Sequence, residues 1–107
     1  MLHGLNELAA ECLQVAIDHG FQEATHFRWD SERNLFLAKL MLVVSEAGEA
    51  AEAVRKGDLA NLTEELADML IRLFGMCAAL GIDIEAAVQE KHEFNKARPH
   101  KHGGKAL

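Results

Sequence analysis

Residues 35–56 read LFLAKLMLVVSEAGEAAEAVRK, and with the segment NLTEELADMLIRLFGMCAAL at residues 61–80 they decide the fold. Apolar residues in both segments recur at intervals of three and four, which is the spacing of one helix face. The connection between the two segments is short, which favours antiparallel helices packed side by side. Because the sequence lacks the strict alternation of a strand, it predicts an all-α fold with a four-helix-bundle-like protomer.

The same spacing and the capping residues predict where each helix begins and ends. The expected helices lie at about residues 6–19, 32–56, 61–80 and 84–96. Ser31, Asn61 and Asp83 are the expected N-cap residues, and Gly81 follows the third helix, where glycine is favoured. The predicted buried faces consist of Leu5, Leu8, Cys12, Val15 and Ala16 in the first helix, Leu35, Ala38 and Leu42 in the second, and Leu62, Leu66, Leu70, Leu73 and Cys77 in the third.

The composition fits one small domain with more apolar surface than one chain can cover. Half of the 107 residues are hydrophobic, and we expect a single helical domain over residues 1–107, with a basic tail at 99–107. A domain of this size often gains burial by self-association. A homodimer or a dimer of dimers is therefore expected.

The charge balance and the apolar runs argue against two classes of partner. The formal net charge is −6, whereas a nucleic-acid-binding module normally presents a basic face. The uncharged apolar run at residues 40–44 is far too short to span a bilayer. Cys12 and Cys77 are isolated, as is common in a reducing compartment, and no signal-like pattern is evident. We expect a soluble cytoplasmic protein that binds neither a nucleic acid polymer nor a membrane.

Two pairs of acidic residues interrupt the apolar pattern of the two central helices. Glu46 and Glu49 are three residues apart, and so are Glu65 and Asp68, so each pair lies on one helix face. A single pair of this kind is more often a solvated surface. Four carboxylates inside one bundle would repel each other and resist desolvation. The pattern therefore predicts a divalent cation among them, and oxygen ligands suit Mg²⁺ or Mn²⁺.

The last predicted helix carries a row of two cationic side chains and one amide. Lys91, Asn95 and Arg98 follow one another at steps of four and three residues, and so share one helix face. Taken alone, such a row is more often a surface that forms salt bridges. An ammonium, an amide and a guanidinium also suit phosphate oxygens, so beside a metal site the row predicts a phosphate clamp.

Four segments in this order resemble the all-α nucleoside triphosphate pyrophosphohydrolases of the MazG-like type, which are relatives of the dimeric dUTPases and dCTP pyrophosphatases. The resemblance is carried by SEAGEAAE at residues 45–52, EELAD at 64–68, Lys91-x-x-x-Asn95-x-x-Arg98-Pro99, and KHGGK at 101–105. It covers the chain from about residue 34 to the C-terminus.

The resemblance implies Mg²⁺-dependent cleavage between the α- and β-phosphates of a nucleoside triphosphate, which gives a nucleoside monophosphate and pyrophosphate. It implies metal ligation by Glu46, Glu49, Glu65 and Asp68, and phosphate binding by Lys91, Asn95 and Arg98. Glu46 or Glu49 could accept the proton of the attacking water. Family members often have two adjacent acids at the start of the first motif. Here Ser45 stands in place of the first acid, so the number of metal ions stays open.

His26 and Trp29, in the connection ahead of the second helix, are candidates for the base pocket. An indole ring can stack on a nucleobase, and His26 could form a hydrogen bond at the rim of such a pocket. Trp29 could equally plug the end of the bundle. The sequence does not name the base.

Two other interpretations remain open at this stage. A carboxylate-bridged di-iron bundle needs two Glu-x-x-His motifs, and this chain has one, at residues 23–26. A non-catalytic oligomeric helical interaction module would keep its acidic residues solvated. Such a module would not be stabilised by Mg²⁺, whereas the enzyme would be stabilised by Mg²⁺ with a nucleotide.

Overall fold

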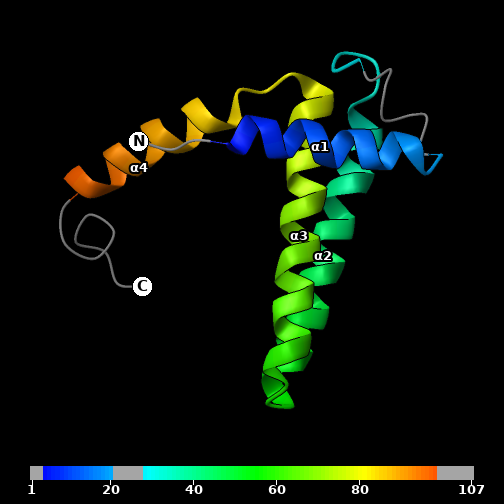
Figure 1. Ribbon diagram of the computed structural model, residues 1–107, viewed down its shortest axis with the longest axis vertical. Helices are drawn as coiled ribbons and strands as arrows, with labels where there is room; N and C mark the ends of the chain where they lie inside the picture. Colours follow the sequence, from blue (N-terminus) through cyan, green and yellow to red (C-terminus); the bar gives the residue numbers. More distant parts are fainter. Residues whose placement is uncertain (1–3, 21–27, 99–107) are drawn as a thin grey trace.

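The computed structural model describes residues 4–20 and 28–98, and these residues form four helices without any strand. The helices, labelled in Figure 1, are α1 (Leu5–Asp18), α2 (Arg33–Arg55), α3 (Leu59–Leu80) and α4 (Ile84–Ala97). Each begins and ends within two residues of its predicted position. The predicted all-α fold is therefore confirmed. Within the described residues, no helix is both long enough and apolar enough to cross a membrane.

The capping residues differ from the prediction at two of the three helices. The Asn61 backbone N–H donates to Asp58 Oδ1 at 3.0 Å, so Asp58 caps α3 and the helix starts one half-turn earlier than expected. The N-terminus of α2 has no side-chain cap, so the role expected for Ser31 is wrong. Asp83 caps α4 as predicted, because its Oδ1 accepts a hydrogen bond from the Ala86 backbone N–H at 3.0 Å.

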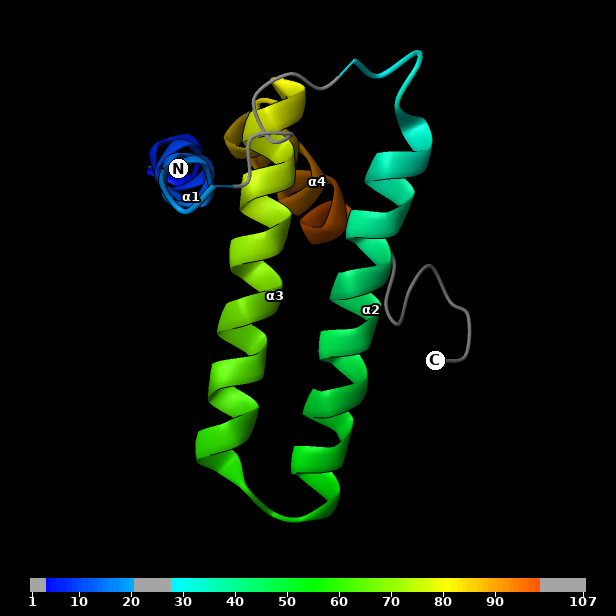
Figure 2. The same ribbon diagram turned by 90° about the vertical axis from the view of Figure 1, so that its right-hand side faces the viewer.

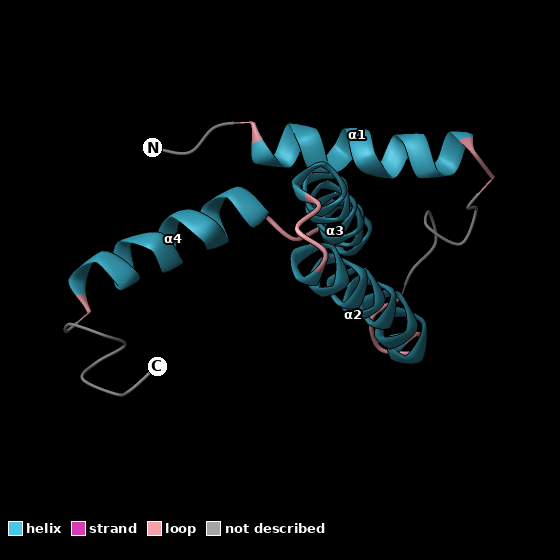
Figure 3. Ribbon diagram, turned by 90° about the horizontal axis from the view of Figure 1, so that it is seen from below, coloured by secondary structure: helices cyan, strands magenta, loops and turns pink. Residues whose placement is uncertain are grey.

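Helices α2 and α3 form an antiparallel hairpin that runs along the length of the molecule (Figure 2). Helix α1 crosses α3 near the end of this hairpin and packs against it (Figures 1 and 3). Helix α4 leaves the same end and extends away from the hairpin. It is tied to α1 at its first turn, where Glu85 Oε1 accepts from the Leu5 backbone N–H at 2.8 Å and Asp83 Oδ1 accepts from Asn6 Nδ2 at 2.9 Å.

The buried face of α2 is displaced by one residue from the predicted one. Ala38 and Leu42 were expected inside, but both are exposed. The buried residues of α2 are Phe36, Val43, Ala50 and Ala53. A displacement of one residue turns a helix face by about 100°. The predicted stripe is therefore not the side of α2 that is most buried.

The covered face of α3 matches the prediction in part, because Leu62, Leu73 and Cys77 are partly buried as expected. Leu66 and Leu70 were expected inside, but they are 48% and 52% exposed. Glu65 and Met69, the residues just before them, are partly buried instead. Cys77 is partly buried and forms no disulfide. The hairpin thus places a carboxylate in its own seam and presents leucines on its outer surface.

One copy of the chain leaves much of its apolar surface uncovered. The buried hydrophobic residues of the described segments are Ala9, Phe36, Val43, Ala50 and Ala53. The radius of gyration is 16.1 Å, whereas a compact domain of this length has about 13 Å. The exposed apolar side chains that we call the outward apolar face of the hairpin are Leu42 and Val44 on α2 and Leu66 and Leu70 on α3.

Candidate functional site

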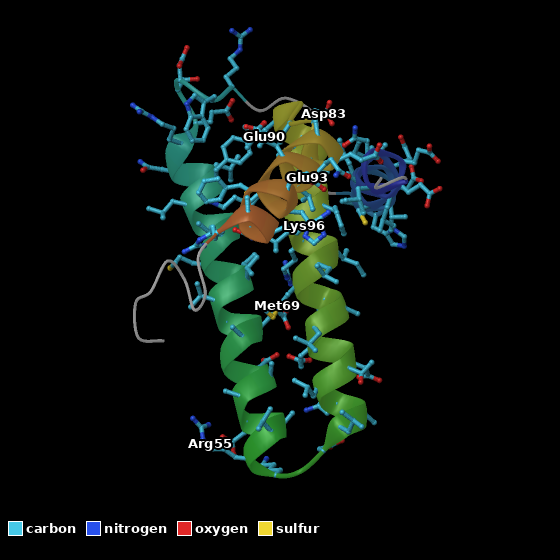
Figure 4. The ribbon with its side chains drawn as sticks, turned by 90° about the vertical axis from the view of Figure 1, so that its left-hand side faces the viewer. Arg55, Met69, Asp83, Glu90, Glu93 and Lys96 are labelled. Atoms are coloured by element: carbon cyan, nitrogen blue, oxygen red, sulfur yellow. The ribbon has the colours of Figure 1, made fainter. Side chains whose placement is uncertain are left out.

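Three carboxylates meet across the seam between α2 and α3. Glu46 and Glu49 come from α2 and Glu65 comes from α3, and one oxygen of each lies within 4.8 Å of the others. Glu46 and Glu65 are partly buried and Glu49 is exposed. Met69, labelled in Figure 4, lies between the two helices one turn along α3 from Glu65. We refer to Glu46, Glu49 and Glu65 as the carboxylate cluster.

The helical repeat explains why these acids lie in the seam. Glu46 precedes Ala53 by seven residues, which is close to two full turns, and Ala53 is only 1% exposed. On α3, Glu65 lies between the partly buried Leu62 and Met69 at steps of three and four. Because α2 and α3 are antiparallel, the two covered faces bring the acids together.

The cluster is electrostatically unfavourable without a positive charge. Glu65 Oε2 is buried and, among residues 4–20 and 28–98, meets no hydrogen-bond donor when the carboxylates are charged. The pKa of Glu65 is raised from 4.5 to about 7, chiefly by a hydrogen bond shared with Glu49, then by burial and by Glu46. An unpartnered buried oxygen within a set of oxygen donors fits a hard divalent cation. The residues present could therefore hold a metal ion.

Arg72 is a part of this site that sequence reasoning missed. Its Nε donates to Glu46 Oε1 at 3.4 Å, and the side chains of Arg72 and Glu46 are 42% and 15% exposed. The signal was present in the spacing, because Arg72 follows Asp68 by four residues and Glu65 by seven, which places it on the same helix face. The sequence-based prediction placed phosphate-binding cations on the last helix alone.

Asp68 is the fourth expected metal ligand, and it does not join the other three. Its carboxylate is exposed and lies outside the cluster of oxygens within 4.8 Å. It follows Glu65 by three residues on α3, so it lies at the rim of the same face. Its carboxylate would have to move from this exposed position to join the cluster.

The expected phosphate row lies on a different part of the molecule. Lys91, Asn95 and Arg98 are exposed on or beside the outer end of α4, which extends away from the hairpin (Figure 1). Lys91 Nζ lies 4.8 Å and Arg98 Cζ 5.9 Å from the ring centroid of Phe94. Phe94 is itself 57% exposed. Within one chain, the structure does not bring this row to the carboxylate cluster.

Trp29 lines a hollow of about 710 Å³ at the end of the hairpin away from the α2–α3 turn. The other walls include Arg33, Phe36, Leu40, Met76 and Leu80. The ring centroids of Trp29 and Phe36 are 6.1 Å apart. His26, the Glu-x-x-His motif at residues 23–26 and the tail at residues 99–107 lie outside the described residues.

A comparison with models of known protein families identifies the family of the segment that carries these features. Residues 36–102, more than half of the chain, match the model of the MazG nucleotide pyrophosphohydrolase domain. The matched segment contains both acidic pairs, Arg72 and the phosphate row. The comparison with curated proteins found no match, and neither did the comparison with solved structures.

Proposed function

This chain belongs to the MazG nucleotide pyrophosphohydrolase family, and we propose that it hydrolyses a nucleoside triphosphate to the monophosphate and pyrophosphate with Mg²⁺ as cofactor. The observation that carries the proposal is the carboxylate cluster, whose oxygens lie within 4.8 Å of one another. A solvated acidic surface would not leave a buried Glu65 oxygen without a partner. Mn²⁺ could substitute for Mg²⁺, because both prefer oxygen ligands.

In this proposal Glu46, Glu49 and Glu65 hold the ion, and Asp68 completes the set from the rim. When bound, the ion would offset the charge of the triphosphate and polarise the phosphorus that is attacked. The protein fixes the positions of the carboxylates by holding them on two packed helices. Such preorganisation removes the cost of assembling the ligands during the reaction.

Glu49 is better placed than Glu46 to accept the proton of the attacking water. It is the exposed member of the cluster, whereas Glu46 is largely covered and pairs with Arg72. The water oxygen would form a bond to the α-phosphorus as the bond from that phosphorus to the bridging oxygen breaks. The bridging oxygen leaves with pyrophosphate, and the carboxylate takes the proton.

We propose that the phosphate row acts in a homo-oligomer, either a homodimer or a dimer of dimers. A second copy would cover the outward apolar face of the hairpin. Assembly would also give α4, which is held chiefly at its first turn, a neighbour to pack against. Lys91, Asn95 and Arg98 could then bind phosphate oxygens at a carboxylate cluster.

The hollow beside Trp29 is our candidate for the nucleobase site. Its walls are mainly apolar, and such walls with a few polar groups are typical of ligand pockets. Trp29 would stack on the base. A Trp29→Ala variant whose Michaelis constants are unchanged for every nucleotide would exclude this role.

The proposal is tested by measuring pyrophosphate release from a panel of nucleoside and deoxynucleoside triphosphates with Mg²⁺ or Mn²⁺. We expect Glu49→Gln to abolish turnover while circular dichroism stays helical. Glu52→Gln is the matched control, because Glu52 pairs with Arg55 on the exposed side of α2. Unchanged turnover in Glu49→Gln with excess metal would exclude the assigned ligands. If the wild type releases no pyrophosphate and is not stabilised by Mg²⁺ with nucleotide, the chain acts as a non-catalytic interaction module.

A further inference from the structure

Arg72 lies beside the carboxylate cluster but is only loosely attached to it. The bond from its Nε to Glu46 Oε1 is 3.4 Å long, which exceeds the usual 2.7–2.9 Å of a strong charge-assisted hydrogen bond. By contrast, the Arg55–Glu52 pair on α2 has an N–O distance of 2.8 Å. The Arg72 guanidinium is therefore near the cluster without being committed to one strong partner.

Most of the donors of Arg72 are unused. A guanidinium has five N–H groups in a rigid planar fork, and the structure shows only the Nε bond to a described residue. The side chain is 42% exposed, whereas that of its partner Glu46 is 15% exposed. The Arg72 side chain is thus partly open to solvent and to a ligand that binds at the cluster.

The unused N–H groups of Arg72 could offset the negative charge of a bound triphosphate. A triphosphate brings several negative charges to a place that already holds three carboxylates. Even with a divalent ion present, phosphate oxygens beside Glu46 and Glu49 need a cation of the protein. The phosphate row on α4 is separated from the cluster within the chain, whereas Arg72 already touches it.

We propose that Arg72 is a phosphate-binding residue of this site, and that Glu46 holds its guanidinium at the cluster until a triphosphate arrives. The inference rests on the proposed function and adds to it a residue from the hairpin itself. A planar guanidinium can bind two phosphate oxygens at once. Because Glu46 already restrains the side chain, less conformational freedom is lost when the phosphate binds.

Two probes separate this role from a structural one. The first is Mg²⁺ alone, measured by calorimetric titration. The second, added with saturating Mg²⁺, is a nucleoside triphosphate that carries a methylene group between the α- and β-phosphorus and so binds without cleavage. The variants are Arg72→Gln and Arg72→Lys, and Arg55→Gln is the control because it removes an arginine from an exposed ion pair outside the cluster.

We expect Arg72→Gln to change the two affinities in opposite directions. Loss of a charge-assisted hydrogen bond should weaken binding of the triphosphate analogue by about tenfold or more. Removal of a positive charge beside the carboxylates should strengthen binding of Mg²⁺ alone by roughly threefold at low salt. Arg72→Lys should bind the analogue with intermediate affinity, because it keeps the charge and loses the fork. Arg55→Gln should leave both affinities unchanged.

Each other result overturns the proposal. If Arg72→Gln weakens binding of both probes, Arg72 only positions Glu46. If Arg72→Gln binds the analogue as the wild type does, Arg72 makes no phosphate contact, and the proposed function stands without it. If the wild type binds neither Mg²⁺ nor the analogue and releases no pyrophosphate from any nucleotide, the proposed function itself fails. Circular dichroism of each variant confirms that the helices are retained.

Discussion

Addition of Mg²⁺ to the metal-free protein should release a proton from Glu65. The pKa of this carboxyl is raised to about 7 by the hydrogen bond shared with Glu49, by burial and by Glu46. Near neutral pH the cluster therefore holds a proton in place of a cation. A metal ligand must be deprotonated to bind, so uptake of the ion displaces that proton into the buffer.

The size of the release follows from the pKa. A group with a pKa of about 7 is about 0.9 protonated at pH 6, about 0.5 at pH 7 and about 0.1 at pH 8, and the proton release per ion follows the same series. Apparent Mg²⁺ affinity should rise over this range for the same reason. Above pH 8 the affinity should become independent of pH.

Calorimetric titration in buffers of different ionisation enthalpy measures the number of protons directly. Glu65→Gln should abolish the release at pH 6, because the amide has no proton to lose there. Glu64→Gln is the matched control, since Glu64 is the exposed neighbour on the same helix. A wild type that binds Mg²⁺ at pH 6 without releasing a proton would refute the reasoning, and so would equal release in wild type and Glu65→Gln.

The same group makes the stability of the metal-free protein depend on pH. An unfolded glutamate titrates near 4.5, and folding raises the pKa of Glu65 to about 7. Between these values the folded state binds the proton and the unfolded state does not. The free energy of unfolding should therefore fall as the pH rises from about 4.5 to about 7 and then level off. Urea melts across this range should show the slope in wild type and lose it in Glu65→Gln.

Three further predictions concern the assembly and the helix ends. Leu70→Glu should dissociate the proposed oligomer, measured by sedimentation, whereas Leu59→Glu at the 73% exposed start of α3 should not. Equal sedimentation of both variants would exclude the proposed interface. Asp58→Ala should lower the free energy of unfolding by about 1 kcal/mol through loss of the cap of α3, and an unchanged urea midpoint would contradict that cap. The pKa of Asp83 is lowered from 3.8 by hydrogen bonds from Asn6 and the Ala86 N–H. The contribution of Asp83 to stability should therefore be lost as the pH falls below 3.8. If an Asn6→Ala variant loses stability on acidification to the same extent as the wild type, the Asn6 hydrogen bond does not make this contribution.

The helices were predictable because the sequence features that set their positions are local. Apolar periodicity, turn glycines and the Asp83 cap place each helix within two residues of the observed one. The buried faces were not predictable in the same way. Leucine-rich stripes mark an apolar face, but the sequence does not say whether that face meets a helix of the same chain or of another copy. Leu66 and Leu70 were assigned to the buried face of α3 for this reason, whereas both are about half exposed.

The candidate site was predictable in part. Spacing alone places Glu46 with Glu49 on one face and Glu65 on another, and the short connection brings the two faces together. Spacing could not show that Asp68 lies at the rim, or that α4 leaves the hairpin, because both depend on tertiary packing. Arg72 belongs to the site because its side chain reaches Glu46 across the seam, and this contact also depends on tertiary packing.

The exposed leucines and the carboxylate cluster have one physical origin. A hairpin of two amphipathic helices can turn either its leucines or its acids toward its own seam, and this one turns the acids inward. Uncompensated acidic side chains in the seam destabilise the packing of the two helices. Leucines on the outer face leave apolar area in water. A cation in the seam and a second copy on the outer face would remove both costs. Because both act on the same two helices, a variant that prevents assembly should also bind Mg²⁺ more weakly, even though the mutated residue is exposed and lies outside the carboxylate cluster.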